Sequence, residues 1–260
     1  MDISSTQRLP SGIIERRFTI PGAGGRPVPG VLWTREGATG ATPLLLIGHG
    51  GGGSKDAPNV LLRRDAFTGG HGIATVAIDA PGHGERGLVR SITDVAWAEL
   101  WAQPEQVLDE MTGDWRSTLD GLLALGEFDE AAVGYGRLSL GTVFGIPFVA
   151  AEPRIAVAVL GLCGVRRAPG VVAAELEERR SARIIAAAPR VQCPVLYHVQ
   201  WDDELFDRDG AFELYGLLGS VDKRLQSTPG PHGGASLEAV ETMNTFLANR
   251  LLAVPAPAPA

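Results

Sequence analysis

Short runs of apolar residues alternate along the chain with longer segments in which apolar and polar residues are mixed. The short runs have the length of strands, and a strand that is apolar on both faces must be covered on both faces. The longer segments have helical periodicity. In the last one, Val240, Met243, Leu247 and Leu251 recur three or four residues apart and share one face. The alternation predicts an α/β fold with a mostly parallel sheet and helices on both of its faces.

The pattern predicts about eight strands, at 13–20, 26–34, 43–48, 73–79, 131–136, 155–162, 195–200 and 224–227. It predicts helices at 59–68, 92–125, 141–151, 171–188, 208–218 and 236–252, with Asn59 and Ser236 as N-caps. We expect a single domain over residues 1–252, followed by an extended tail of mostly Ala and Pro at 253–260. The stretch 163–190 is too short for a large cap domain, and we expect at most a small lid there.

The composition allows a sizeable core and excludes several classes of protein. The 260 residues are 45% hydrophobic and 20% charged, and the formal net charge is −7. A mildly acidic chain lacks the clustered basic face of nucleic-acid-binding proteins, so we expect no nucleic-acid partner. We find no signal peptide and no apolar run of ~18 residues, which predicts no membrane span. The two cysteines form no disulfide framework, and this favours a cytoplasmic location.

A serine lies between the strand predicted at 131–136 and the helix that follows it, and a glycine stands two residues later. This arrangement, Ser139-Leu140-Gly141, is typical of a nucleophile elbow. The tight turn strains the serine backbone and lifts the Oγ atom clear of the sheet. Because the helix begins at once, its dipole and the N–H of Leu140 point toward a developing oxyanion. The alternative is that Ser139 serves only as a helix N-cap.

Three other predicted strand ends carry groups that suit such a site. The glycine-rich loop 50–53 leaves backbone N–H groups uncovered, and in a hydrolase Gly51 would be the second oxyanion donor. Three acidic residues at 202–204 follow the strand at 195–200, and the local sequence leaves the choice among them open. His232 lies among glycines and prolines just before the last helix, so it is expected in a loop, where it can act as a base.

These segments resemble the α/β-hydrolase superfamily, in particular its branch of dienelactone-hydrolase-like proteins and small bacterial serine esterases. The resembling pieces, from about Pro43 to the last helix, are Gly48-His49-Gly50-Gly51, 79–86, 138–142, Asp202-Asp203 and Gly230-Pro231-His232. The order serine, acid, histidine along the chain is that of this superfamily. The resemblance implies a serine hydrolase for small soluble carboxylic esters, or related thioesters or lactones, that needs no cofactor and no metal. It also favours Asp203 as the acid, because the family acid lies shortly before an apolar step such as Leu205-Phe206.

Arg137 departs from the family pattern, which has a small residue two positions before the nucleophile. We expect its side chain either to crowd the elbow or to reach the pocket, where it would bind a substrate carboxylate. Trp97 and Trp101 lie in a predicted helix and are candidates for the pocket wall, with core packing as the alternative. Dienelactone hydrolases carry a cysteine nucleophile, so serine here argues against a dienelactone substrate. The sequence leaves a homodimer open.

Two other functions are compatible with parts of the sequence. The glycines of 48–53 spell GxGxxG after a strand, and Asp79 ends the next strand, as in a dinucleotide-binding oxidoreductase. However, no helix opens directly after these glycines, and this interpretation explains neither Ser139 nor His232. The other alternative is a non-catalytic ligand-binding protein of the same fold, because a fold does not determine a function.

Overall fold

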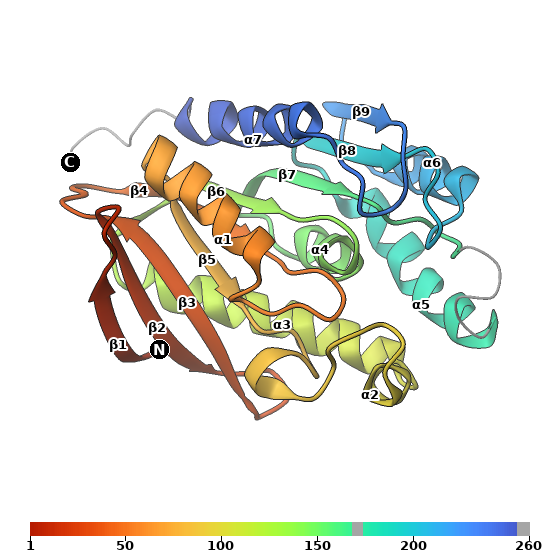
Figure 1. Ribbon diagram of the computed structural model, residues 1–260, viewed down its shortest axis with the longest axis horizontal. Coiled ribbons are helices and arrows are strands. Elements are labelled where there is room, and N and C mark those ends of the chain that lie inside the picture. Colours follow the sequence, from red (N-terminus) through yellow and green to blue (C-terminus); the bar gives the residue numbers. More distant parts are fainter. Residues whose placement is uncertain (168–173, 254–260) are drawn as a thin grey trace.

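The computed structural model describes residues 1–167 and 174–253. Within these residues nine strands form one sheet, in the order β1-β2-β3-β5-β4-β6-β7-β8-β9 (Figure 1). The strands are β1 (Asp2–Arg8), β2 (Ile13–Pro21), β3 (Pro27–Arg35), β4 (Thr42–Ile47), β5 (Ala74–Ile78), β6 (Phe128–Gly136), β7 (Ile155–Gly161), β8 (Val195–Gln200) and β9 (Lys223–Thr228). The pairs among β1, β2, β3 and β5 are antiparallel, and all pairs from β5 through β4 to β9 are parallel. The predicted mostly parallel sheet is confirmed.

Helices cover both faces of this sheet (Figure 1). On one face lie α1 (Pro58–Arg64) and α7 (Leu237–Leu252), and on the other lie α3 (Pro104–Leu123), α4 (Leu140–Ala151) and α5 (Ala174–Ala187). The remaining helical elements are η1 (Asp65–His71), η2 (Gly84–Arg86), α2 (Val95–Leu100), η3 (Ala188–Arg190) and α6 (Arg208–Leu217). The carboxyl ends of the parallel strands, where we expect the functional residues, therefore lie between two layers of helices.

The central strands are buried on both faces, and their successive side chains alternate between two hydrophobic clusters. In β4, Leu44 and Leu46 belong to the cluster that includes α3 and α4, whereas Leu45 and Ile47 belong to the cluster with α7. This alternation follows from the two-residue repeat of a strand. The uninterrupted apolar run at 43–48 is thus the sequence of a strand that is covered on both sides.

Of the nine strands of this sheet, β1 is the one that the hydrophobic pattern did not predict. Its sequence is Asp-Ile-Ser-Ser-Thr-Gln-Arg, and all seven residues are exposed. It lies at the edge of the sheet and pairs only with β2. Because none of its residues is buried, no apolar run marks it in the sequence. Polar and charged side chains on such an edge strand also disfavour its pairing with other chains.

Two predicted helices begin or break at prolines. The helix expected at 59–68 is α1 followed by the π-helical turn η1, and its N-cap is Ala57, with Pro58 in the first turn, rather than Asn59. The helix expected at 92–125 is divided into α2 and α3, because Pro104 begins a new helix. In the last helix, Ser236 is the N-cap as predicted, and its side chain accepts a hydrogen bond from the N–H of Ala239.

The described part of the segment 163–190, for which we expected at most a small lid, contains helix α5 and the turn η3. Its helix α5 contacts α3 and α4, and the Arg179 side chain donates to the Glu105 carboxylate of α3 at 2.6 Å. Residues 168–173, in the middle of this segment, and residues 254–260 of the expected tail lie outside the described residues. In the part of the chain that is described, no helix combines the length and the apolar character that a membrane crossing requires.

A buried ion-pair network fastens the loop after β5 to α3. The Arg86 guanidinium donates to Asp114 Oδ2 at 2.7 Å and to Glu110 Oε1 at 2.6 Å. It also donates to the carbonyl oxygen of Asp79 at 3.0 Å. The three charged side chains are 5%, 8% and 0% exposed for Arg86, Glu110 and Asp114. These charges have been removed from water, so each depends on its partners.

Replacing Asp114 by alanine should therefore destabilise the fold. We expect Asp114→Ala to lower the free energy of unfolding by about 3 kcal/mol, because Arg86 would stay buried with only Glu110 left to pair with it. The control is Glu213→Ala, which removes an ion pair to Arg166 whose side chains are 51% and 49% exposed. That substitution should change stability by less than ~1 kcal/mol. Urea unfolding followed by tryptophan fluorescence measures both, and equal effects would contradict the role assigned to burial.

Candidate active site

Ser139 lies in the sharp turn between β6 and α4. Its backbone has φ 60° and ψ −126°, a conformation that residues other than glycine rarely adopt. Hydrogen bonds to β7 hold the turn in place. The N–H of Ser139 donates to the carbonyl of Gly161 at 2.9 Å, and the N–H of Arg137 donates to that of Val159 at 3.0 Å. The buried hydroxyl of Thr142 lies 2.8 Å from the same Gly161 carbonyl. The strained serine is thus held by the neighbouring strand.

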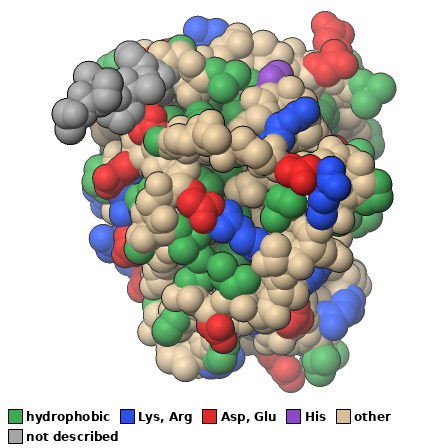
Figure 2. Space-filling model, turned by 90° about the vertical axis from the view of Figure 1, so that its left-hand side faces the viewer, with side chains coloured by type: hydrophobic (Ala, Val, Ile, Leu, Met, Phe, Trp, Pro, Cys, Tyr) green, Lys and Arg blue, Asp and Glu red, His purple; other side chains and the backbone are tan. Residues whose placement is uncertain are grey.

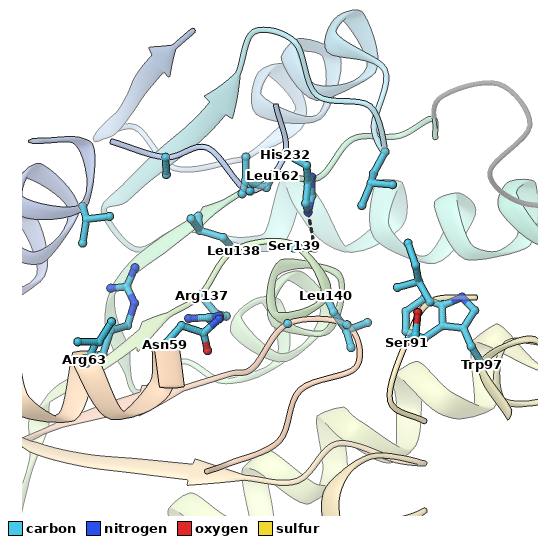
Figure 3. A pocket seen from close by; sticks show the side chains of 18 of the residues that line it. Asn59, Arg63, Ser91, Trp97, Arg137, Leu138, Ser139, Leu140, Leu162 and His232 are labelled. Atoms are coloured by element: carbon cyan, nitrogen blue, oxygen red, sulfur yellow. Dashed lines mark hydrogen bonds between the residues drawn. The ribbon is translucent and has the colours of Figure 1, made fainter. Parts of the chain in front are cut away.

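Three side chains from different loops form a hydrogen-bonded chain at this turn. His232 Nε2 lies 2.8 Å from Ser139 Oγ (Figure 3), and His232 Nδ1 lies 2.8 Å from Asp203 Oδ2. The Asp203 carboxylate is itself oriented by the N–H groups of Leu205 and Phe206, which donate to Oδ1 at 2.8 and 3.0 Å. The carboxylate faces the imidazole in a fixed orientation, and the imidazole faces the serine.

The three acidic residues after β8 have separate partners. Asp203 contacts the imidazole ring of His232, whereas Glu204 Oε2 accepts from the backbone N–H of His232 at 2.8 Å. Asp202 Oδ2 accepts from the N–H of Gly230 at 3.1 Å. The structure therefore places Asp203, the residue that the family resemblance favoured, on the histidine ring. Its two neighbours hold the loop that carries the histidine.

Ser139 and His232 line a cavity of about 720 Å³ (Figure 3). Gly51 and Leu140, the expected oxyanion donors, line the same cavity. Among the described residues, neither of their backbone N–H groups donates a hydrogen bond. Leu162, at the end of β7, also lines the cavity and has a positive φ of 47°. Among the described residues other than glycine, both that have a positive φ, Ser139 and Leu162, thus line the cavity, as strained residues do at many functional sites.

The two tryptophans proposed for the pocket wall differ in position. Trp97 lines the cavity. Trp101 is not among the described residues that line it, and its indole stacks on Phe144 with ring centres 5.7 Å apart and an interplanar angle of 18°. It also contacts Trp97 from behind, at 5.7 Å between ring centres. The expectation of a wall position is therefore corrected for Trp101, because its ring is used in core packing.

His49 anchors the glycine-rich loop as a neutral imidazole. Its Nδ1 atom donates to the Gly50 carbonyl at 2.9 Å, and its Nε2 atom accepts from the N–H of Ala80 at 3.0 Å. Burial lowers the pKa of His49 to about 4, and the nearby His83 contributes to the lowering. A neutral ring with one donor and one acceptor ties the glycine loop to the loop after β5. This contact places Gly50 and Gly51 in the cavity wall.

Asp79, the residue that supported dinucleotide binding, is fully buried and already has partners. Its Oδ1 atom accepts from the backbone N–H of Lys55 at 2.8 Å. Its Oδ2 atom accepts from the Lys55 ammonium at 2.9 Å and from the N–H of Glu85 at 3.0 Å. The carboxylate thus joins the end of the glycine loop to η2. It is not free to bind a ribose hydroxyl, which removes the main support for a dinucleotide site.

Arg137 fits at the elbow because the residues around its stem are glycines. A Cβ atom on Gly141 would lie 2.1 Å from Arg137 Cγ, and one on Gly48 would lie 3.3 Å from it. The stem runs through the space that these missing side chains leave. The guanidinium then lies near Gly50 and lines the cavity. Of the two outcomes expected for this residue, the side chain reaches the pocket and leaves the elbow intact.

Arg63 of α1 also lines the cavity, although the sequence was not interpreted in that way. It is buried, and its Nη1 atom donates to Asn244 Oδ1 of α7 at 3.0 Å. A signal was present in the sequence. Val60, Arg63 and Phe67 follow one another at spacings of three and four residues, so an arginine stands on the buried face of the predicted helix.

A methyl group at position 141 should collide with the stem of Arg137. We expect Gly141→Ala to lower the free energy of unfolding by about 1–3 kcal/mol, as overpacking does elsewhere. In an Arg137→Gly background the same substitution should cost much less. Urea unfolding of the four proteins gives the interaction energy of the pair. Additive effects would contradict the contact between the two residues.

Folding stability should fall in acid because His49 is neutral in the folded chain. Its pKa is about 4 when folded and has the ordinary value of 6.5 when unfolded, so between these values only the unfolded chain takes up the proton. The stabilisation is complete above pH 6.5 and is lost as the pH falls toward 4, by roughly 3 kcal/mol in all. Urea unfolding at pH 7 and pH 4.5 should show a smaller drop for His49→Gln than for the wild type. Drops of equal size would exclude His49 as the source.

Comparison with known proteins gives the chain a family. No protein-family model and no curated protein matches the sequence. Among solved structures, an acetyl xylan esterase from Paenibacillus sp. R4 shares the fold, with 19% identity over 96% of this chain and 90% of that chain and a TM-score of 0.76. A cold-adapted esterase from an Arctic intertidal metagenomic library, in a PEG-bound complex, is 33% identical over 96% of this chain and 99% of that chain, with a TM-score of 0.81. On that identity over nearly the whole of both chains, the protein belongs to the same family of α/β-hydrolase-fold proteins as the Arctic esterase.

Proposed function

We propose that the protein is a serine hydrolase that cleaves small soluble carboxylic esters through an acyl-enzyme on Ser139. The observation that carries this proposal is the chain of hydrogen bonds from Asp203 through His232 to Ser139, at 2.8 Å on each side of the imidazole. The serine lies on a strained elbow at the wall of a cavity. Membership in a family that includes an esterase supports an ester as the substrate.

In the acylation step, Ser139 Oγ attacks the acyl carbon while His232 Nε2 takes the hydroxyl proton. Asp203 accepts from Nδ1–H, which keeps the imidazole in the tautomer that presents a lone pair to the serine, and it stabilises the imidazolium that forms. The N–H groups of Leu140 and Gly51 bind the oxyanion, and the loss of one such donor typically costs about 3 kcal/mol. When the tetrahedral intermediate collapses, the imidazolium returns the proton to the departing alcohol.

In the deacylation step, a water molecule takes the position of the alcohol. His232 removes a proton from this water as its oxygen attacks the acyl carbon, and the same N–H groups bind the second oxyanion. The bond to Ser139 Oγ then breaks, and the imidazolium gives its proton to that oxygen. The products are a free carboxylic acid and the regenerated serine. The same steps serve a thioester or a lactone.

The cavity favours small substrates. Its volume of about 720 Å³ is within the range of sites for small molecules. Ile92, Trp97 and Leu205 contribute apolar surface to the wall, which suits a short acyl chain. The motifs around His49 and His232 support a place in the dienelactone-hydrolase-like branch, and the serine nucleophile favours simple esters within it.

The catalytic role of Ser139 can be tested with a fluorophosphonate probe and p-nitrophenyl esters. We expect the probe to label the wild type and not Ser139→Ala, and kcat to fall roughly 10,000-fold or more in that variant. Asp203→Asn should lower kcat by roughly 10,000-fold, because the imidazole would be held in the wrong tautomer.

Asp202→Asn is the matched control, since it is the same substitution one residue away on a side chain that contacts only the His232 loop. It should retain kcat within tenfold. If the folded wild type neither reacts with the probe nor turns over any ester, the proposal is wrong. A non-catalytic ligand-binding role would then be favoured.

A further inference from the structure

Positive charge is concentrated at the cavity beside Ser139. No aspartate or glutamate is among its described lining residues. Four arginines are among them, namely Arg63, Arg90, Arg137 and Arg167. The chain as a whole is acidic, with a formal net charge of −7. On the face shown in Figure 2, acidic and basic side chains are interspersed and gather into no large area of one sign. The described lining of the cavity is therefore basic, although the chain as a whole is acidic.

Two of these arginines are buried and lack a carboxylate. Arg137 is 7% exposed, and among the described residues its side chain makes no ion pair and no hydrogen bond; its Nε atom is buried without a partner. Arg63 is 6% exposed, and its hydrogen-bond partner is the neutral amide of Asn244. Buried arginines elsewhere in the chain are different, because Arg86 pairs with two carboxylates and Arg180 pairs with Glu177.

The two guanidiniums stay charged at neutral pH despite their burial. Burial lowers the pKa of Arg137 to about 9, with a further lowering by the charge of Arg63, and burial lowers the pKa of Arg63 to about 10. Two like charges without counter-ions in a desolvated wall oppose folding. An anion that contacts both would remove their repulsion and replace the water that they have lost. Such an anion would be bound more tightly than at an exposed arginine.

The pair lies on one side of the nucleophile. In Figure 3, Arg63, Arg137 and Asn59 are on one side of Ser139, and Trp97 is on the other. Ser139, Arg63 and Arg137 line the same cavity, so a ligand that fills it can contact the serine and the guanidiniums together. Guanidinium groups match carboxylates with two parallel hydrogen bonds, which favours a carboxylate as the anion.

We propose that Arg63 and Arg137 form a carboxylate subsite and that the preferred substrates are esters with a free carboxylate a few bonds from the ester group. The inference rests on the proposed ester hydrolysis and adds the substrate class to it. The carboxylate belongs either to the acyl part, as in a half-ester of a dicarboxylic acid, or to the alcohol part. Both present the same group to the two arginines, and the choice of substrates separates them.

Matched pairs of esters test the preference. For the acyl part, kcat/KM is compared between mono-p-nitrophenyl glutarate and p-nitrophenyl pentanoate, which have the same chain length. For the alcohol part, 3-carboxyphenyl butyrate is compared with phenyl butyrate. We expect the wild type to prefer the charged member of one pair. In Arg63→Gln and in Arg137→Gln that preference should fall roughly 10- to 100-fold, the value of a hydrogen-bonded charge pair.

Arg64→Gln is the matched control. Arg64 is the next residue of α1, is not among the described residues that line the cavity, and pairs with Asp65 at 2.7 Å. The control should keep both the activity and the preference of the wild type. If the wild type cleaves neutral esters and shows no preference in either pair, the subsite is wrong and ester hydrolysis stands.

A binding measurement separates the subsite from catalysis. In Ser139→Ala, glutarate should raise the thermal unfolding temperature while neutral pentanamide should not, and adding Arg137→Gln should abolish the rise. If glutarate has this effect and the wild type cleaves no ester, the subsite is supported and the proposed hydrolysis is refuted. No glutarate effect, in a protein that cleaves neutral esters, would refute the subsite alone.

The variant Arg137→Met tests whether the role of Arg137 is purely structural, through its unfolding temperature and its preference for charged esters. Because Arg137→Met removes a buried charge without a counter-ion, it should unfold at a temperature no lower than the wild type. It should also lose the preference for charged esters. A lower unfolding temperature together with an unchanged preference would show that Arg137 is structural and would overturn the proposal.

Discussion

The strained backbone of Ser139 is the constraint on which the rest of the site depends. A φ of 60° at a residue other than glycine costs about 1–3 kcal/mol and persists only where its surroundings over-determine it. Here β7 binds the turn on one side, and α4, which is buried over most of its length, begins at the next residue. The position of Leu140 at the cavity, the hydrogen bond between Ser139 and His232 and the path of the Arg137 stem all depend on this turn.

The buried charges around the turn are of two kinds: some are paired within the protein, and others face the cavity without a carboxylate partner. The buried charges that support the site from behind are neutralised within the chain: Asp79 by Lys55, and Arg86 by Glu110 and Asp114. His49, which contacts the glycine-rich loop, is neutral and adds no charge of its own. Among the described residues, the two buried arginines without a carboxylate partner, Arg63 and Arg137, both line the cavity. The buried charges behind the site are thus paired within the protein, whereas these two are in contact with the space that a ligand would fill.

Much of this arrangement could be predicted from the sequence because it depends on local pattern. Apolar runs identified the buried strands, and the small residues around Ser139 and His232 identified the loops at their ends. The local sequence could not distinguish Asp203 from the two acidic residues beside it, because their partners are fixed only when the β8–α6 loop folds. The family resemblance alone favoured Asp203. β1 could not be found from hydrophobicity, because it buries no side chain.

Other assignments depend on contacts between distant parts of the chain. Trp97 and Trp101 are both almost fully buried, and only the position of Phe144 decides which indole faces the cavity. Arg63 and Arg64 are adjacent and chemically identical, and the helix phase relative to α7 determines which of them is buried.

Because the Arg137 stem packs against glycines, the order in which positions 137 and 141 can change is restricted. An ancestor with a small residue at 137 could have carried either glycine or alanine at 141. Arginine at 137 fits without rearrangement only where 141 is glycine, since a Cβ there would overlap the Arg137 Cγ. Once arginine is lost, a side chain gained at 141 disfavours its return. In a relative with alanine at 141, a library that randomises position 137 alone would therefore recover this arginine only at a cost of about 1–3 kcal/mol of stability, which its benefit to binding would have to offset.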